Sequence, residues 1–198
     1  GLGDVYKRQG LAFIVAASPV KQGTVRVTLT TRDPQVLQRS LEVQALFGPE
    51  PVSGWWVDGL APRPGVYRLE ASFPGAGYLN REMAVDPGVL LPLAGNPSLT
   101  FGTQEFLFRW GRVAGAEAYY AELWRLGEGD RPETSYPLFV TQASEVRLQV
   151  NPLPPGRYRA RIFALSAHPR DFARLADRLA FPFNVSSVWT PVASWGTP

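Results

Sequence analysis

The sequence contains no cysteine and a single histidine, His168. The absence of cysteine excludes disulfide bonds, thiolate zinc sites and cysteine nucleophiles, although it leaves export from the cell open. One histidine cannot supply a histidine-based metal site. His168 stands beside a proline in an expected loop, where a solvated side chain is the more common role. These absences predict no metal site.

Motifs that carry enzymatic chemistry are also missing. The chain has no H-E-x-x-H, G-x-S-x-G, P-loop or Rossmann glycine pattern, and no D-x-D-x-D-G calcium loop. The carboxylates Asp58, Glu70, Glu82 and Asp86 are scattered, so nothing points to the facing pair that a glycosidase uses. We therefore expect no enzyme, no catalytic residues and no cofactor, with a carboxylate-pair enzyme as a remote alternative.

Charge and hydropathy exclude two further classes of partner. The formal net charge of +3 is mild and no basic run is present, so we expect no nucleic-acid partner. A membrane-spanning helix needs about 20 consecutive apolar residues. No stretch of the sequence approaches that length, so we expect no transmembrane segment.

The first nine residues, GLGDVYKRQ, have no hydrophobic periodicity and no capping signal. Their codons can be written as a transposon-end adapter used for DNA sequencing libraries. We therefore interpret residues 1–9 as translated adapter from an assembled environmental sequence, and exclude them from reasoning about the fold. The segment that follows, residues 10–20, has two interpretations. It is either the remnant of a secretory signal peptide or a first strand over 12–16.

Proline and glycine, 19 residues of each, punctuate short apolar runs along the whole chain. This punctuation is typical of an all-β protein. Residues 23–31 show the expected alternation, with Val25, Val27 and Leu29 on one side of a strand. Further strands are expected at 41–48, 54–60, 65–73, 78–86, 99–101, 105–110, 118–126, 136–143, 144–150, 156–167 and 181–193.

Three segments interrupt this series of strands. Residues 86–98 contain three prolines and two glycines and look like the boundary between two domains, although 89–93 could add a short strand. Residues 128–135 are expected to form a polar loop. Within 171–179, Phe172, Leu175 and Leu179 recur at helical spacing, which predicts a short amphipathic helix.

The second half of the chain resembles a fibronectin type III domain over residues 97–192. The residues that carry the resemblance are Phe108-Arg109-Trp110, Val113, Ala116 and residues 119–123, followed by Leu153, Pro155 and Tyr158. The resemblance implies a core tryptophan at 110 and a tyrosine corner at Tyr158. The helix expected between the last two strands departs from the family's pattern.

The first half contains a loose echo of the same motif. LAPRPGVYRLEASF at 60–73 and LPPGRYRARIFAL at 153–165 share leucine, proline, glycine, tyrosine and arginine in the same order. We therefore predict two tandem immunoglobulin-like antiparallel β-sandwich domains, at 21–94 and 97–193. The short helix would lie between the last two strands of the second domain.

Two of the expected strands are predicted to build a binding surface. Alternation places Tyr158, Ala160, Ile162 and Ala164 in the core, and Tyr119, Ala121 and Leu123 with them. The outer face would then carry charged and aromatic side chains together. It could be a docking face for an acidic partner or glycan, or a ladder stabilised by its own cation–π and ionic contacts. The residues expected on it are Tyr120, Glu122, Trp124, Arg157, Arg159 and Arg161.

Two other places are candidate surfaces. Trp55 and Trp56 are adjacent in a strand and face opposite sides, so one of them, Trp55, could be exposed or could pack on the other domain. Arg170, Arg174 and Arg178 recur on one face of the expected helix. That face could bind a partner or could simply be solvated.

These observations predict a non-enzymatic, exported bacterial protein of the cell envelope or extracellular space. Its role would be structural or adhesive, and its partner an envelope protein or a surface polysaccharide. The alternative is a carbohydrate-binding accessory module of a larger secreted hydrolase.

Overall fold

The computed structural model describes residues 7–17, 24–30, 39–41, 53–60, 63–73, 77–168 and 181–196. Its described elements are β-strands and one 3-10 turn, Glu128–Asp130, so the expected all-β class is confirmed. The helix expected at 171–179 lies outside the described residues. The chain divides into two compact units. Unit 1 comprises Gly1–Gln9, Leu91–Ser166 and Ser186–Pro198, and unit 2 comprises Gly10–Leu90 and Ala167–Val185.

The division falls between Leu90 and Leu91, within the segment expected to separate two domains. The two units are not contiguous ranges of the sequence, because Ala167–Val185 clusters with unit 2. The fully described segment at 89–93 forms no strand. Asn184 Nδ2 donates hydrogen bonds to the carbonyls of Pro87 (2.6 Å) and Val89 (3.2 Å), all three residues being in unit 2.

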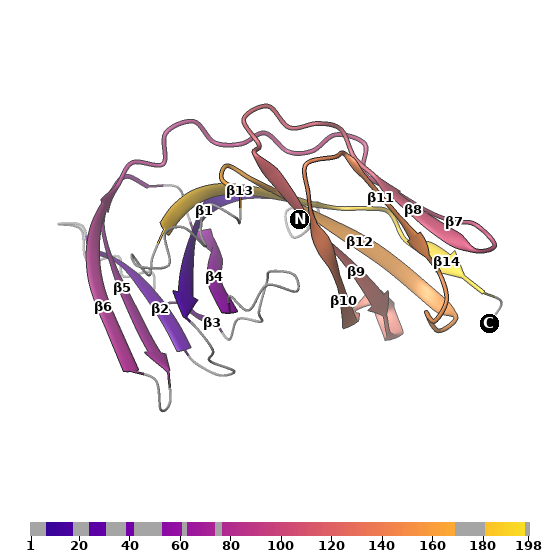
Figure 1. Ribbon diagram of the computed structural model, residues 1–198, viewed down its shortest axis with the longest axis horizontal. Helices are drawn as coiled ribbons and strands as arrows, with labels where there is room; N and C mark the ends of the chain where they lie inside the picture. Colours follow the sequence, from indigo (N-terminus) through magenta and orange to yellow (C-terminus); the bar gives the residue numbers. More distant parts are fainter. Residues whose placement is uncertain are drawn as a thin grey trace. The chain divides into compact units, whose positions relative to one another are not determined.

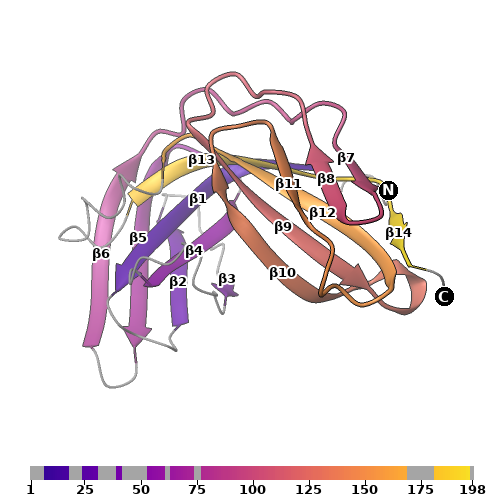
Figure 2. The same ribbon diagram turned by 45° about the vertical axis from the view of Figure 1, so that its right-hand side comes forward.

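Unit 1 is built from two antiparallel sheets (Figure 2). The first sheet has the order β11-β8-β7. The second has the order β10-β9-β12, continued on β12 by β14 and by the part of β13 that belongs to unit 1. The strands are β7 (Ser98–Phe101), β8 (Glu105–Arg109), β9 (Ala118–Leu126), β10 (Pro132–Thr141), β11 (Glu145–Gln149), β12 (Gly156–Leu165), β13 (Phe181–Trp189) and β14 (Ala193–Trp195).

Two expected segments of unit 1 differ from the structure by more than two residues. The loop expected at 128–135 is shorter, because Pro132–Ser135 continues β10 and pairs with β9. The last expected strand is divided into β13 and β14, and Pro191, which lies between them, has no amide hydrogen to donate to a sheet.

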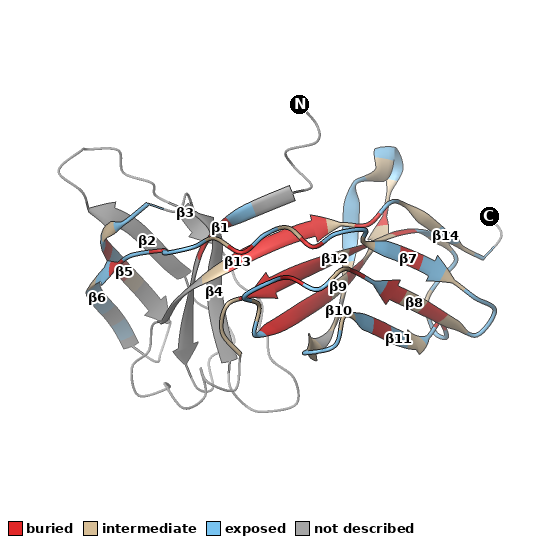
Figure 3. Cartoon of the chain, turned by 90° about the horizontal axis from the view of Figure 1, so that it is seen from above, coloured by how far each residue is buried: buried red, intermediate tan, exposed pale blue. Residues whose placement is uncertain are grey.

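The core of unit 1 follows the alternation predicted from the sequence. Tyr158, Ala160 and Ile162 of β12 are fully buried, and they pack with the inward residues of β9 against β8. Buried positions run along much of β9 and β12, whereas β7, β8 and β11 alternate with exposed positions (Figure 3). Trp110 lies in this core, as the resemblance implied.

Tyr158 forms the predicted tyrosine corner. Its hydroxyl donates a hydrogen bond to the carbonyl of Pro154, four residues earlier, while its ring is completely buried. Gly156 between them has a φ of 157°, and a Cβ there would meet Arg125 Nε at 3.0 Å. The chain therefore needs glycine at this entry to β12.

Unit 2 contains a four-stranded antiparallel sheet of order β3-β2-β5-β6 and the antiparallel pair β1–β4 (Figure 1). Of the segment at 10–20, which was expected to be a signal remnant or to contain a strand, residues 10–17 belong to β1 and residues 18–20 lie outside the described residues. β1 begins at Lys7, within the range interpreted as adapter. The strand expected at 41–48 is described only up to Leu41. The strands are β1 (Lys7–Ala17), β2 (Thr24–Thr30), β3 (Arg39–Leu41), β4 (Ser53–Leu60), β5 (Gly65–Phe73) and β6 (Gly77–Val85).

A second tyrosine corner opens β5. Tyr67, which is 2 % exposed, donates its hydroxyl hydrogen to the carbonyl of Arg63 at 2.5 Å, again four residues earlier. Gly65 has a φ of 153°. Gly65 and Tyr67 oppose Val85 and Met83 of β6, as Gly156 and Tyr158 oppose Trp195 and Ala193 of β14. The sequence echo is thus a repeated local structure with the same register.

We expect Tyr158→Phe and Tyr67→Phe each to lower the free energy of unfolding by about 0.5–1.5 kcal/mol, the usual net value of one hydrogen bond. Urea unfolding followed by far-UV circular dichroism measures this loss. Tyr78→Phe is the control, because Tyr78 is 65 % exposed. A loss of equal size in Tyr78→Phe would contradict the role given to the two corners.

Alkaline pH provides a second readout for the same variants. Burial is the main cause that raises the pKa of Tyr67 and of Tyr158 above the ordinary value of 10. Above pH 10 the unfolded chain therefore loses these phenol protons first, and ionisation favours unfolding. We expect the stability of the wild type to fall as pH rises beyond 10, and to fall less steeply in the two phenylalanine variants.

Candidate functional site

The outward residues of β9 and β12 form cross-strand rows, as predicted. Arg159 lies opposite Trp124, Arg161 opposite Glu122, and Phe163 opposite Tyr120. Directly opposed side chains on one face of an antiparallel pair are close enough to interact. Ser187 and Trp189 of β13 lie on the same face, because Val188 between them points into the core. We call these eight residues the outer-face ladder.

Arg161 is the centre of the ladder. Its guanidinium carbon lies 4.2 Å from the centroid of the Phe163 ring and 5.3 Å from that of Trp189. Its Nη2 donates to Ser187 Oγ at 3.2 Å. Cation–π contacts of this kind hold the guanidinium in a fixed place on the sheet.

Arg159 is oriented by the backbone of the segment after β13. Its Nε donates to the carbonyl of Thr190 at 2.9 Å. Arg157, by contrast, extends toward the 3-10 turn Glu128–Asp130, which precedes β10. It forms a two-point ion pair with Asp130, with Nη1–Oδ1 at 3.0 Å and Nη2–Oδ2 at 3.1 Å. The three arginines predicted to act together therefore divide into one ion-paired residue and two ladder residues.

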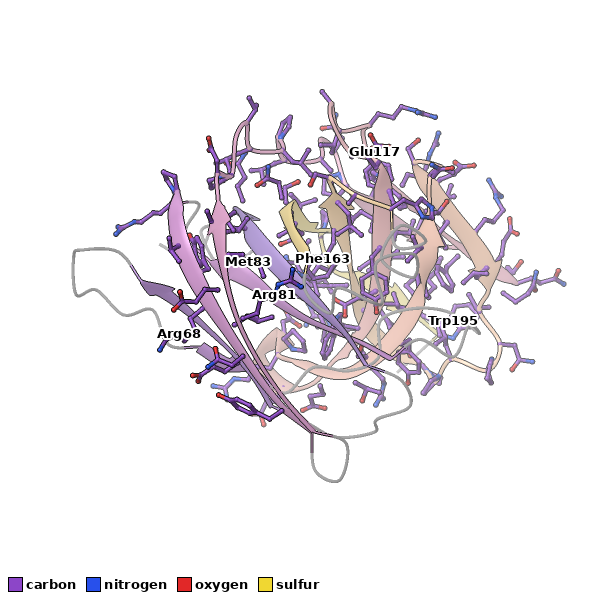
Figure 4. The ribbon with its side chains drawn as sticks, turned by 60° about the vertical axis from the view of Figure 1, so that its left-hand side comes forward. Arg68, Arg81, Met83, Glu117, Phe163 and Trp195 are labelled. Atoms are coloured by element: carbon purple, nitrogen blue, oxygen red, sulfur yellow. The ribbon has the colours of Figure 1, made fainter. Side chains whose placement is uncertain are left out.

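Burial changes along the ladder. Tyr120 and Phe163, with ring centroids 5.9 Å apart, are buried, whereas Trp124 and Trp189 are half-buried. The two tryptophan rings lie 6.3 Å apart with planes 53° from each other. Burial, with Glu122 as a second cause, raises the pKa of Tyr120 well above its ordinary value, so it remains a neutral phenol. Figure 4 labels Phe163 on β12.

The opposite outer face of unit 1 has a different character. On β8 and β11, Arg147 Nη1 lies 2.5 Å from Glu105 Oε1 and Arg109 Nε lies 3.5 Å from Glu145 Oε2. All four side chains are 41–63 % exposed. Exposed ion pairs of this kind contribute little to stability. The two faces of one sandwich are therefore an ionic face and an aromatic–arginine face.

Sequence reasoning missed Phe163, Ser187 and Trp189. Phe163 follows Arg161 by two residues, so strict alternation along β12 would have placed it on the same face. Ser187 and Trp189 join the face because β13 pairs beside β12, and nothing local in the sequence gives that pairing.

The structure does not describe the side chains of the other predicted candidates. The backbone of Trp55 pairs with Val15 in β1–β4, and its side chain lies outside the described residues, as do Arg170, Arg174 and Arg178. His168 is half-buried at the end of a described segment. Among the described residues, no group of three or more histidine, aspartate or glutamate side chains could hold a metal ion.

Two of the scattered carboxylates, Glu82 and Asp86, have local partners. Glu82 Oε1 lies 2.7 Å from Arg68 Nη2, the arginine labelled on β5 in Figure 4. Asp86 Oδ1 accepts the amide of Gly88 at 3.1 Å. Within the described ranges, no helix has the length and apolar character needed to cross a membrane.

Comparison with known proteins finds similarity among solved structures. No family model matches the sequence, and no curated protein matches it. Among solved structures, the FN1–FN3 domains of chicken CNTN1 are similar, with a TM-score of 0.31 and 17 % identity over 72 % of this chain. The match spans half of that chain's length. The strand order, the core tryptophan and the tyrosine corner of unit 1 are those expected of a fibronectin type III-like, immunoglobulin-like β-sandwich.

Proposed function

We propose that this chain is a non-enzymatic binding protein of the bacterial cell envelope, exported from the cell and built from two tandem β-sandwich modules. The half-buried residues of the outer-face ladder of unit 1 form its binding surface, and the partner is a surface polysaccharide or another envelope protein. These residues are Glu122, Trp124, Arg159, Arg161 and Trp189. The observation that carries the proposal is the concentration of aromatic and arginine side chains on one outer face. Aromatic residues and arginine are the residues most enriched where proteins bind partners.

The internal contacts of the ladder support binding as well as stability. Arg161 and Arg159 are held by Ser187, Trp189 and Thr190 before any partner arrives. Side chains that are already ordered lose less conformational entropy on association. A ladder with such contacts is therefore preorganised for a flat or extended partner.

The repeated tyrosine corner supports the two-module organisation. Tyr67 and Tyr158 make the same i to i−4 hydrogen bond after the same Pro-Gly pair and at the same register. Sandwich modules of this architecture are widespread in cell-surface proteins. Fold-level analogy of this kind supports an extracellular role without naming a ligand.

One observation favours the alternative, a carbohydrate-binding accessory module of a larger secreted hydrolase. Trp124 and Trp189 are neighbouring half-buried rings on a sheet face, and tryptophan rings offer a broad apolar surface for sugar rings. The gene itself separates the two candidates. An uncontaminated sequence with a basic start and an apolar run before Leu11 supports export of this chain, whereas a long reading frame encoding a catalytic domain supports the accessory module.

Binding is tested by co-sedimentation of the purified chain with two bacterial envelope preparations, one rich in polysaccharide and one rich in protein. We expect the wild type to sediment with at least one of them, and Trp189→Ala to be retained about tenfold less. Leu107→Ala is the matched control, because Leu107 is half-buried on the ionic face. Failure of the wild type to sediment with either, or equal losses in the two variants, would contradict the proposal.

A further inference from the structure

We infer that the outer edge of β11 (Glu145–Gln149) pairs with the same edge of a second copy of this chain, in an antiparallel dimer with two-fold symmetry. This edge is separate from the outer-face ladder, because β11 belongs to the other sheet of unit 1. Dimer formation at β11 is therefore independent of the proposed function.

β11 is the terminal strand of the three-stranded sheet β11-β8-β7. Figure 3 shows it at the margin of that sheet, next to β8. Among the described residues, no strand pairs with its other side. Its side chains alternate, so that Val146 is buried while Glu145, Arg147 and Gln149 are exposed. An exposed edge strand of this kind is a template for pairing with another chain.

The hydrogen bonds to β8 determine which backbone groups of β11 face away from the sheet. The carbonyl of Ser144 accepts the amide of Trp110 at 3.1 Å, and the amide of Val150 donates to β8 at the other end of the pair. In an antiparallel pair, residues that bond to the partner alternate with residues whose groups point away. The even-numbered residues of β11 therefore bond to β8. The odd-numbered residues direct their N–H and C=O groups outward, and these groups have no hydrogen-bond partner within the described residues.

The other margins of unit 1 are less open to pairing. β10 contains Pro132 and Pro137, which have no amide hydrogen, and its register with β9 shifts twice. Prolines and bulges protect edge strands from pairing. β7 and β14 lie against each other, with the rings of Phe101 and Trp195 stacked at 6.0 Å. β11, by contrast, has no proline, no glycine and no register shift.

The outward side chains of β11 favour a second copy as the partner. When two β11 strands pair antiparallel about Val146, Glu145 of each copy lies opposite Arg147 of the other. Opposite charges on directly opposed residues stabilise an antiparallel pair, whereas pairing about Arg147 would place two arginines opposite each other. A two-fold axis requires this self-complementarity, because each copy contributes the same patch of surface.

The ion pairs already present leave atoms for this contact. Arg109 Nε lies 3.5 Å from Oε2 of Glu145, and Arg147 uses Nη1 toward Glu105. Oε1 of Glu145, and Nε and Nη2 of Arg147, make no hydrogen bond within the described residues. Pairing between copies therefore extends an alternating row of charges and keeps the pairs within each copy.

The first test is sedimentation equilibrium of the full chain over a range of concentrations. The expected register gives about four backbone hydrogen bonds between the copies. Such a small interface is weak, so we expect dimers to form between about 10 μM and 1 mM. Raising the salt concentration is expected to weaken the dimer, because salt screens the exposed charges.

Amide hydrogen exchange followed by NMR identifies the register in the wild type. As concentration rises, the amides of Glu145 and Arg147 should become protected, whereas that of Gln149 should continue to exchange fast. Val146 and Leu148 serve as internal references, because their amides face β8 at every concentration. Protection that also includes Gln149 would indicate pairing about Arg147 and would overturn the charge-matched register.

Variants assign the association to this edge. Arg147→Pro removes an outward amide but no bond to β8, and we expect about tenfold weaker dimers because each copy loses one hydrogen bond. Arg147→Glu is expected to weaken the dimer about tenfold, because like charges then oppose each other twice. Combining it with Glu145→Arg restores opposite charges between the copies and should return the affinity to within about threefold of the wild type. Circular dichroism confirms that each variant is folded.

Arg131→Glu is the matched control, because it changes the net charge equally at an exposed arginine outside β11. We expect it to change the dimer affinity by less than about twofold. An equal loss in this control would attribute the association to net charge and overturn the inference. Association that is undiminished in Arg147→Pro would place the contact elsewhere on the chain, and a wild type that remains monomeric up to about 1 mM would leave no dimer to explain. Either result overturns the inference, while the envelope co-sedimentation decides the proposed function separately.

Discussion

Replacement of Trp110 with alanine is expected to lower the free energy of unfolding of unit 1 by about 3–5 kcal/mol, the range for truncating a large core side chain. Trp110 is 5 % exposed and belongs to the core of unit 1. Its ring centroid lies 4.8 Å from that of Phe108 and 5.4 Å from that of Tyr119. Alanine would leave a cavity between these two rings. Urea unfolding followed by far-UV circular dichroism measures the loss without relying on tryptophan fluorescence.

Trp110→Phe is the matched variant, because it keeps an aromatic ring in the same place. The indole Nε1 of Trp110 is buried and has no hydrogen-bond partner within the described residues. Substitution by phenylalanine therefore removes no hydrogen bond with those residues. We expect a smaller loss of about 1–2 kcal/mol from reduced volume alone. A loss as large as that of alanine would contradict the view that Trp110 acts by filling space.

Local patterns in the sequence were sufficient for the parts of the fold that depend on alternation. The strand expected at 118–126 matches β9 residue for residue, because Tyr119, Ala121 and Leu123 alternate with more polar neighbours. The tyrosine corner is equally local, since the Tyr158 hydroxyl reaches only four residues back. The same locality explains why the motif can be recognised again before Tyr67.

Features that depend on pairing between distant strands could not be predicted. Pro132–Ser135 reads as a polar loop, and only its pairing with β9 makes it a strand. Trp189 joins the outer-face ladder through the position of β13 beside β12. The sequence separation between Arg159 and its acceptor at Thr190 is 31 residues, and no local periodicity encodes that contact.

The ladder illustrates both cases. Tyr120, Glu122, Trp124, Arg159 and Arg161 were placed on one face by the period of two along each strand. The residues that contact these side chains could not be predicted, so the sequence left open whether the face was a self-stabilised ladder or a docking surface. The contacts of Arg161 with Phe163, Trp189 and Ser187 establish the ladder, and the two roles are compatible because ordered side chains bind with less loss of entropy.

Thr190→Val is expected to lower the free energy of unfolding by about 1–3 kcal/mol, the cost of leaving a buried polar group unsatisfied. Thr190 is completely buried at the point where β13 gives way to Pro191. Its Oγ1 accepts the amide of Ala160 at 3.0 Å and donates to the carbonyl of Pro191 at 2.9 Å, while its own amide donates to the Ala160 carbonyl at 2.9 Å. The hydroxyl thus replaces a backbone acceptor where the strand is interrupted.

Valine keeps the β-branched shape of threonine and removes only the hydroxyl, so the loss isolates the hydrogen bonds. Thr190→Ser keeps the hydroxyl and removes a methyl group, and we expect it to cost about 1 kcal/mol through lost packing. Amide hydrogen exchange distinguishes the two variants beyond their stabilities. The Ala160 amide should exchange faster in Thr190→Val and remain protected in Thr190→Ser, because only serine retains an acceptor for it. An Ala160 amide that stays equally protected in both would mean that β12 and β13 are held together here by packing, and that the Thr190 hydroxyl is dispensable.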